Sequence, residues 1–169
     1  LMALDRASEL TNDVSVRFAV LVHDLGKGLT DPGQWPRHRG HEELGVEPTL
    51  QMAERLNVPE EITELAVDVG RYHLRTSRAL EMRPGKLMAL FEHTNAFSDP
   101  ERFEKILIAT QADAQGRLNH ENIPYPQASF LKEALKSAID VDTKGKTEEV
   151  IREDRTRAVD EVKKAYEIL

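Results

Sequence analysis

The chain of 169 residues has no cysteine, a single tryptophan and only 5% aromatic residues. The absence of cysteine excludes a disulfide scaffold, a thiolate zinc site and a cysteine nucleophile. No apolar run reaches the roughly 20 residues that a membrane-spanning helix needs, and no charged-then-apolar leader opens the chain. We therefore expect a cytoplasmic protein that has no membrane partner.

The composition that is present is typical of one globular domain, with 40% hydrophobic residues, 31% charged residues and a net charge of −7. A domain of this length buries roughly 70% of the surface that its unfolded chain exposes, so it needs no disulfide or structural metal to fold. Proteins that grip nucleic-acid backbones usually carry a basic stripe. The acidic balance therefore argues against a broad grip on RNA.

The apolar residues recur at three- and four-residue steps between breaks rich in Pro, Gly, Asn and Asp, and strand-like alternation is absent. This pattern predicts an all-α helical bundle of about seven to eight helices. Pro48 lies inside one predicted helix, which should kink or split there. The helices are expected at 1–10, 14–26, 40–57, 60–80, 85–97, 100–117, 127–139 and 147–168.

The C-terminal part of the chain differs from the rest in its charge. Residues 141–169 carry many charges of both signs and a thin apolar stripe. We therefore predict one domain over residues 1–140, followed by a charged C-terminal helix that packs on it or faces a partner.

The most informative motif is an apolar helical stretch that ends in the adjacent residues His23 and Asp24. An imidazole and a carboxylate together suit a divalent metal, although for this pair taken alone a buried, hydrogen-bonded histidine is the favoured interpretation. His41, His73 and Asp113 also lie in apolar or uncharged helical surroundings, where a charge is costly unless it is paired or binds metal. Side chains from facing helices build metal sites in bundle cores, so these five residues are candidates for one site.

The order His-Asp, His, His, Asp resembles the HD superfamily of metal-dependent phosphohydrolases, whose domain is an all-helical bundle. The similarity is closest to the C-terminal HD domain of bacterial multifunctional CCA proteins, which are tRNA nucleotidyltransferases, and it fades after about residue 138. Four stretches carry it, namely 17–30, 35–41, 58–73, and 112–117 together with 125–127.

This resemblance implies 2′,3′-cyclic phosphodiesterase, 2′-nucleotidase and phosphatase activities in the processing and repair of tRNA 3′ ends. The implied substrates are the tRNA 3′ end or 2′,3′-cyclic nucleotides. The implied cofactor is a divalent metal, Mg²⁺, Ni²⁺ or Mn²⁺, held by His23, Asp24 and Asp113. His41 and His73 are then either ligands of a second metal or catalytic residues without metal, which contact the phosphate or act as the general acid that protonates the leaving group. The second role is favoured because ligands for two ions are few.

Three basic residues are expected to bind the substrate phosphate in this interpretation. Lys27 follows Asp24 by three residues, and Arg117 lies one helical turn beyond Asp113 and so on the same face. Arg37 belongs to the basic run 37–39 in the loop after the His-Asp pair. Trp35 precedes it, and its ring either stacks a nucleobase at the mouth of the site or anchors the loop on the core.

The departures from the family pattern limit the expected activity. A nucleotidyltransferase head, with its glycine-rich loop and paired carboxylates, is not in these residues, so we expect an N-terminal head elsewhere in the same protein and no CCA addition by this part. The first histidine of the family motif falls just before the segment that matches Leu1 and Met2, so we expect it to be missing from this chain. The helical apolar pattern already includes Leu1, which predicts a chain that begins inside a helix. Two alternatives remain: a non-catalytic helical domain for tRNA positioning or homodimerisation, and an HD nucleotidase with another substrate.

Overall fold

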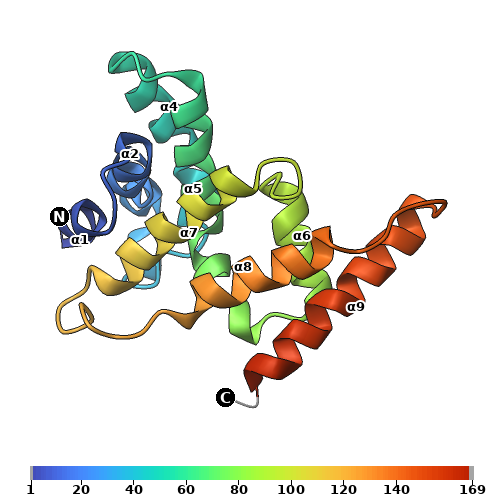
Figure 1. Ribbon diagram of the computed structural model, residues 1–169. Coiled ribbons are helices and arrows are strands. Elements are labelled where there is room, and N and C mark those ends of the chain that lie inside the picture. The colour runs from blue at the N-terminus through green and yellow to red at the C-terminus, as the bar shows by residue number, and fades with distance from the viewer. Residues whose placement is uncertain (1, 168–169) are drawn as a thin grey trace. The chain divides into compact units, whose positions relative to one another are not determined.

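The computed structural model describes residues 2–167, and all regular secondary structure in that range is helical (Figure 1). The α-helices are α1 (Met2–Leu10), α2 (Val14–Val22), α3 (His41–Leu44), α4 (Val46–Arg55), α5 (Glu60–Ser77), α6 (Pro84–His93), α7 (Pro100–Gln115), α8 (Pro126–Ile139) and α9 (Glu148–Glu167). The 3₁₀ helices are η1 (Leu25–Leu29), η2 (Pro32–Gln34) and η3 (Ala79–Glu81). The prediction of an all-α bundle is confirmed. Within the described range no helix is both long and apolar enough to cross a bilayer.

Two predicted helices differ from the structure in an informative way. The segment 40–57 is split into α3 and α4 at Gly45, so that Pro48 lies in the first turn of α4, where a missing N–H costs little. The expected helix 14–26 is too long, because α2 ends at Val22 and the backbone tightens into η1 after Asp24. The expected ends at residues 1 and 168 lie outside the described residues.

The chain forms two compact units, and the first consists of Leu1–Ser77 with Lys105–Tyr125. In this unit α2 packs along α5, α1 packs on α2, and α3 contacts both η1 and α5. The core of this unit is built mainly from small aliphatic side chains, so the helix backbones can approach closely. Its buried members include Val16, Ala19, Val20, Val22, Leu65, Ala66 and Val69.

The second unit consists of Arg78–Glu104 with Pro126–Leu169. Within it α9 lies along α8 and contacts α6 (Figure 1). Phe91 is fully buried, with its ring edge-to-face with Phe103 at 5.5 Å between centroids. Val159 is the fully buried residue of α9, in keeping with the thin apolar stripe of that helix. The boundary near residue 140 stays a prediction.

Asp13 caps the N-terminus of α2, the helix that leads to His23 and Asp24. Its carboxylate accepts a hydrogen bond from the backbone N–H of Ser15 at 2.8 Å and lies 3.0 Å from the ammonium group of Lys105. The hydrogen bond from the Ser15 side chain and the charge of Lys105 lower the pKa of Asp13 from 3.8 to about 2, against the opposing effect of burial. The ionised carboxylate therefore stabilises the folded state.

We expect Asp13→Ala to reduce the free energy of unfolding by about 1 kcal/mol at pH 7, because an orphan N–H of α2 loses its cap. A carboxylate with a depressed pKa contributes stability above its unfolded value of 3.8 and loses it as the pH falls toward 2. Urea unfolding should therefore show the difference between the two proteins shrinking between pH 4 and about pH 2. A difference that stays constant over that interval would contradict the assignment.

Candidate metal centre

Five polar side chains meet in the core of the first unit, and they are the five that the sequence singled out. They are His23 at the end of α2, Asp24 immediately after it, His41 at the start of α3, His73 in α5 and Asp113 in α7. The three histidines are 7%, 3% and 1% exposed, and Asp113 is 9% exposed. Such burial of titratable groups is costly unless something compensates their charges and lone pairs.

Two glycines allow Asp24, which immediately precedes η1, and His41, which begins α3, to come close together. A Cβ on Gly26 would lie 2.0 Å from the carbonyl oxygen of His41 and 2.5 Å from the backbone nitrogen of Gly45, so only glycine permits this approach. Gly40 has φ +77°, a left-handed conformation that glycine adopts without steric cost. The chain can therefore turn sharply and begin α3 with His41 facing the site.

Each histidine of the cluster is oriented by its Nδ1 atom. Nδ1 lies 2.7 Å from the carbonyl oxygen of Val20 in His23, 2.8 Å from that of His38 in His41, and 2.8 Å from that of Gly70 in His73. A carbonyl oxygen can only accept, so Nδ1 carries the proton and donates in all three rings. In the neutral rings the lone pair is then on Nε2, the arrangement in which histidine binds metal.

The Nε2 atoms converge with the carboxylate oxygens at short range. His23 Nε2 lies 3.3 Å from Asp24 Oδ2 and 3.3 Å from Asp113 Oδ1. His41 Nε2 lies 3.3 Å from Asp24 Oδ1 and also 3.3 Å from His73 Nε2. These are all lone-pair atoms when the rings are neutral, so they repel one another unless a positive charge lies among them.

The residues present fit a divalent cation. His23 Nε2 and Asp24 Oδ1 are buried and have no hydrogen-bond partner among the described residues. Two sets of ligand atoms lie within 4.8 Å of one another, His23 with His73 and Asp113, and Asp24 with His41 and His73. Imidazole nitrogens mixed with carboxylate oxygens suit divalent metals such as Zn²⁺, Ni²⁺ or Mn²⁺. Because His73 belongs to both sets, they form one continuous cluster.

The electrostatics of the cluster also require a positive charge. Burial alone lowers the pKa of His23, but the carboxylates of Asp113 and Asp24 outweigh it and raise that pKa to about 10. Burial and the neighbouring His23 lower the pKa of His73. The pKa values of Asp24 and Asp113 lie below the usual value because His23 overcomes the effect of burial. One proton on His23 thus offsets one of the two carboxylate charges, and a bound divalent cation would replace that proton and offset both.

The three predicted phosphate-binding residues lie in different places. Lys27 Nζ is 2.6 Å from Asp24 Oδ2, and Arg117 Nη2 is 3.5 Å from Asp113 Oδ2. Both side chains remain partly open to solvent, at 42% and 60% exposed. Arg37 instead lies on the loop after η1, with no ion pair to any described residue of the cluster. Lys27 and Arg117 therefore flank the cluster, whereas Arg37 forms no ion pair with it.

Thr30 is a residue of this region that the sequence did not reveal. Its hydroxyl donates to the carbonyl oxygen of Lys27 at 2.9 Å and accepts from Trp35 Nε1 at 3.1 Å and from His38 Nδ1 at 2.8 Å. The carbonyl of His38 in turn orients His41. A threonine in a loop carries no pattern that predicts this role, because the role depends on contacts formed only in the folded loop.

The helical fold and the site together define an all-α protein with a buried His/Asp cluster of the kind that binds divalent metal. The chain belongs to the HD domain family, whose model matches residues 1–114. This membership indicates a metal-dependent hydrolase.

The curated relatives are multifunctional CCA proteins. That of Nitrosococcus oceani is 48% identical over 82% of this chain and 34% of its own length, and that of Teredinibacter turnerae is 45% identical over 85% and 35%. That of Nitrosospira multiformis is 43% identical over 90% of this chain and 37% of its own length. The chain thus spans about a third of the relatives that it matches. No solved structure matches it.

Proposed function

We propose that this chain is a metal-dependent phosphohydrolase domain that acts in tRNA 3′-end processing and repair. Its proposed activities are those of a 2′,3′-cyclic phosphodiesterase, a 2′-nucleotidase and a phosphatase. The observation that carries this proposal is a pair of buried atoms, His23 Nε2 and Asp24 Oδ1, that find no hydrogen-bond partner within residues 2–167 and lie in a cluster of five side chains able to bind metal. The similarity to multifunctional CCA proteins supports the choice of substrate.

The proposed ligands are the five residues of the cluster. His41 and His73 are both buried, and their Nε2 atoms lie 3.3 Å and 3.8 Å from Asp24 Oδ1. This placement favours a ligand role over the general-acid role that the sequence favoured, since a general acid must reach the leaving group of the substrate. A bound divalent ion supplies Lewis-acid polarisation of a phosphoryl oxygen and lowers the pKa of a water to near neutral.

The chain's own residues would bind and orient the phosphate at the edge of the cluster. Lys27 offers a compact positive charge beside Asp24, and Arg117 offers a planar guanidinium beside Asp113. Both are partly solvent-accessible, so both can reach a phosphoryl oxygen while their carboxylate partners stay in place. Lys27 and Arg117, each beside a different acidic ligand, would counter the negative charge that develops on the phosphate during hydrolysis.

The remaining parts of the proposal concern the longer protein. We propose that a nucleotidyltransferase head of the same protein carries out CCA addition, that the protein acts in the cytoplasm, and that a homodimer forms. We also propose that residues 141–169 are a charged C-terminal appendage to an HD domain over residues 1–140. Light scattering of the purified chain tests the dimer directly.

The function is tested by assaying the purified chain on 2′,3′-cyclic AMP and adenosine 2′-phosphate with Mg²⁺, Mn²⁺ and Ni²⁺. We expect hydrolysis with at least one ion and its loss on chelation. The matched comparison is a chain extended at its N-terminus to include the first histidine of the family motif. Absence of activity in both forms with every ion would contradict the proposal and favour a non-catalytic role in tRNA positioning or dimerisation.

A further inference from the structure

The loop between the Asp24 and His41 ligands presents its only tryptophan to solvent. Trp35 is 56% exposed, whereas tryptophan usually buries most of its large apolar surface. The structure therefore does not place the ring as an anchor in the core. This loop runs between two candidate metal ligands and exposes an indole. The loop is therefore a candidate binding site for a ligand that contacts the indole.

The indole is held by its edge, and its position is tied to the cluster. Trp35 Nε1 donates to the buried Thr30 hydroxyl, which donates to the carbonyl oxygen of Lys27. Lys27 in turn pairs with Asp24. Only two residues, Thr30 and Lys27, thus link the indole to a proposed metal ligand.

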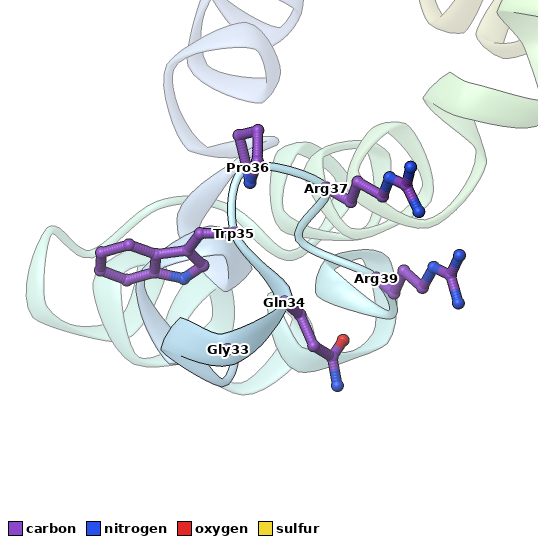
Figure 2. Close-up of a pocket in the computed structure, with 6 residues that line it drawn as sticks. All are labelled: Gly33, Gln34, Trp35, Pro36, Arg37 and Arg39. Carbon is purple, nitrogen blue, oxygen red and sulfur yellow. The ribbon is translucent and has the colours of Figure 1, made fainter.

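Positive charge lies on the same loop. Residues 32–41 contain no Asp or Glu, and Arg37 and Arg39 belong to none of the ion pairs between described residues. A pocket of about 500 Å³ is lined by Gly33, Gln34, Trp35, Pro36, Arg37 and Arg39. Figure 2 shows the indole on one side of the loop and both guanidinium groups on the other.

We propose that this loop binds the single-stranded 3′ end of an RNA, with a base stacked on Trp35 and backbone phosphates on Arg37 and Arg39. The choice of a 3′ end rests on the proposed function. Aromatic stacking with nearby cations is the common chemistry of single-strand recognition, because every base has a π face and every nucleotide has a phosphate. The opposite directions of the indole and the guanidiniums suit a strand that crosses the loop, and local capture is compatible with a net charge of −7.

The first test uses the emission of Trp35, which is the sole tryptophan and so reports on this loop alone. A short unstructured RNA with a 3′-hydroxyl end, which has no terminal phosphate to remove, is titrated into the protein with Mg²⁺. We expect saturable quenching. Arg37→Gln together with Arg39→Gln should reduce the slope of log Kd against log salt by roughly 1.4, about 0.7 for each phosphate that is no longer neutralised.

The second test separates binding of the base from the chemical step. We expect Trp35→Ala to raise KM for an RNA ending in a 2′,3′-cyclic phosphate about tenfold, with a much smaller change in kcat, and Trp35→Phe to restore most of the loss. The loss of kcat/KM should be far smaller on glycerol 2-phosphate, which has no base. Leu56→Ala, which removes an equally exposed side chain from the end of α4, serves as the matched control.

The results distinguish this inference from the proposed function. Hydrolysis of glycerol 2-phosphate without quenching by RNA overturns the RNA-binding loop and leaves the hydrolase intact. Quenching by RNA without hydrolysis of any phosphoester overturns the hydrolase and leaves the loop intact. A blue shift of the emission that depends on protein concentration, with no response to RNA, would make the loop a contact between copies of the chain and would overturn the inference.

Discussion

Replacing Asp24 by alanine is expected to abolish metal-dependent hydrolysis, with a loss in kcat/KM of roughly a thousandfold or more. Asp24 lies close to a histidine of each ligand set. Its Oδ1 atom lies 3.3 Å from His41 Nε2, and its Oδ2 atom lies 3.3 Å from His23 Nε2. Without it, the histidines lose a negative partner and Lys27 loses the carboxylate that holds its ammonium group at the site.

The effect on stability should separate loss of metal from loss of fold. In the metal-free protein Asp24 pairs with His23 and Lys27, so its removal should itself reduce the free energy of unfolding, and each protein is therefore compared with and without metal. A divalent ion at a hundred times its Kd stabilises a protein that binds it by about 2.7 kcal/mol. We expect thermal unfolding to show this increase for the wild type and for Asp140→Ala, an exposed control, and not for Asp24→Ala. Equal stabilisation of all three would contradict a metal site at Asp24.

Gly26→Ala is expected to have the second large effect, although the glycine carries no functional group. The new Cβ would meet three backbone atoms of residues 41 and 45, the nearest at 2.0 Å, so η1 and α3 must separate. Overpacking of this kind costs about 1–3 kcal/mol, and a shift of about 1 Å in a catalytic group costs about a hundredfold in rate. We expect reduced stability, weaker metal binding and a large loss of activity together.

Gly28→Ala is the matched control for this change. Gly28 lies on the same 3₁₀ helix, and its added Cβ would meet no atom within 4 Å. Its free energy of unfolding should change by less than about 0.5 kcal/mol, with metal affinity unchanged in calorimetric titration. If Gly26→Ala binds metal as tightly as Gly28→Ala does, the close approach of η1 to α3 does not position His41.

Local signals in the sequence predicted much of this protein. Helical periodicity and the Pro and Gly breaks indicated the helices, because amphipathic patterning and backbone restrictions act over a few residues. The adjacent His23 and Asp24 and the isolated Asp113 were recognisable because charges are rare in apolar helical stretches. The end of α2 was predicted too late, since the transition to η1 depends on the packing of Gly26 against α3 rather than on local propensity.

The sequence by itself determined the helical class and the identity of the side chains able to hold a metal. Only the tertiary structure decided that the Nδ1 atoms of all three histidines face backbone carbonyls, so that their Nε2 atoms meet two carboxylates. It also decided that Thr30 holds Trp35 by its edge and leaves the indole 56% exposed. Both outcomes depend on side-chain directions set by packing between distant segments, which no local pattern encodes.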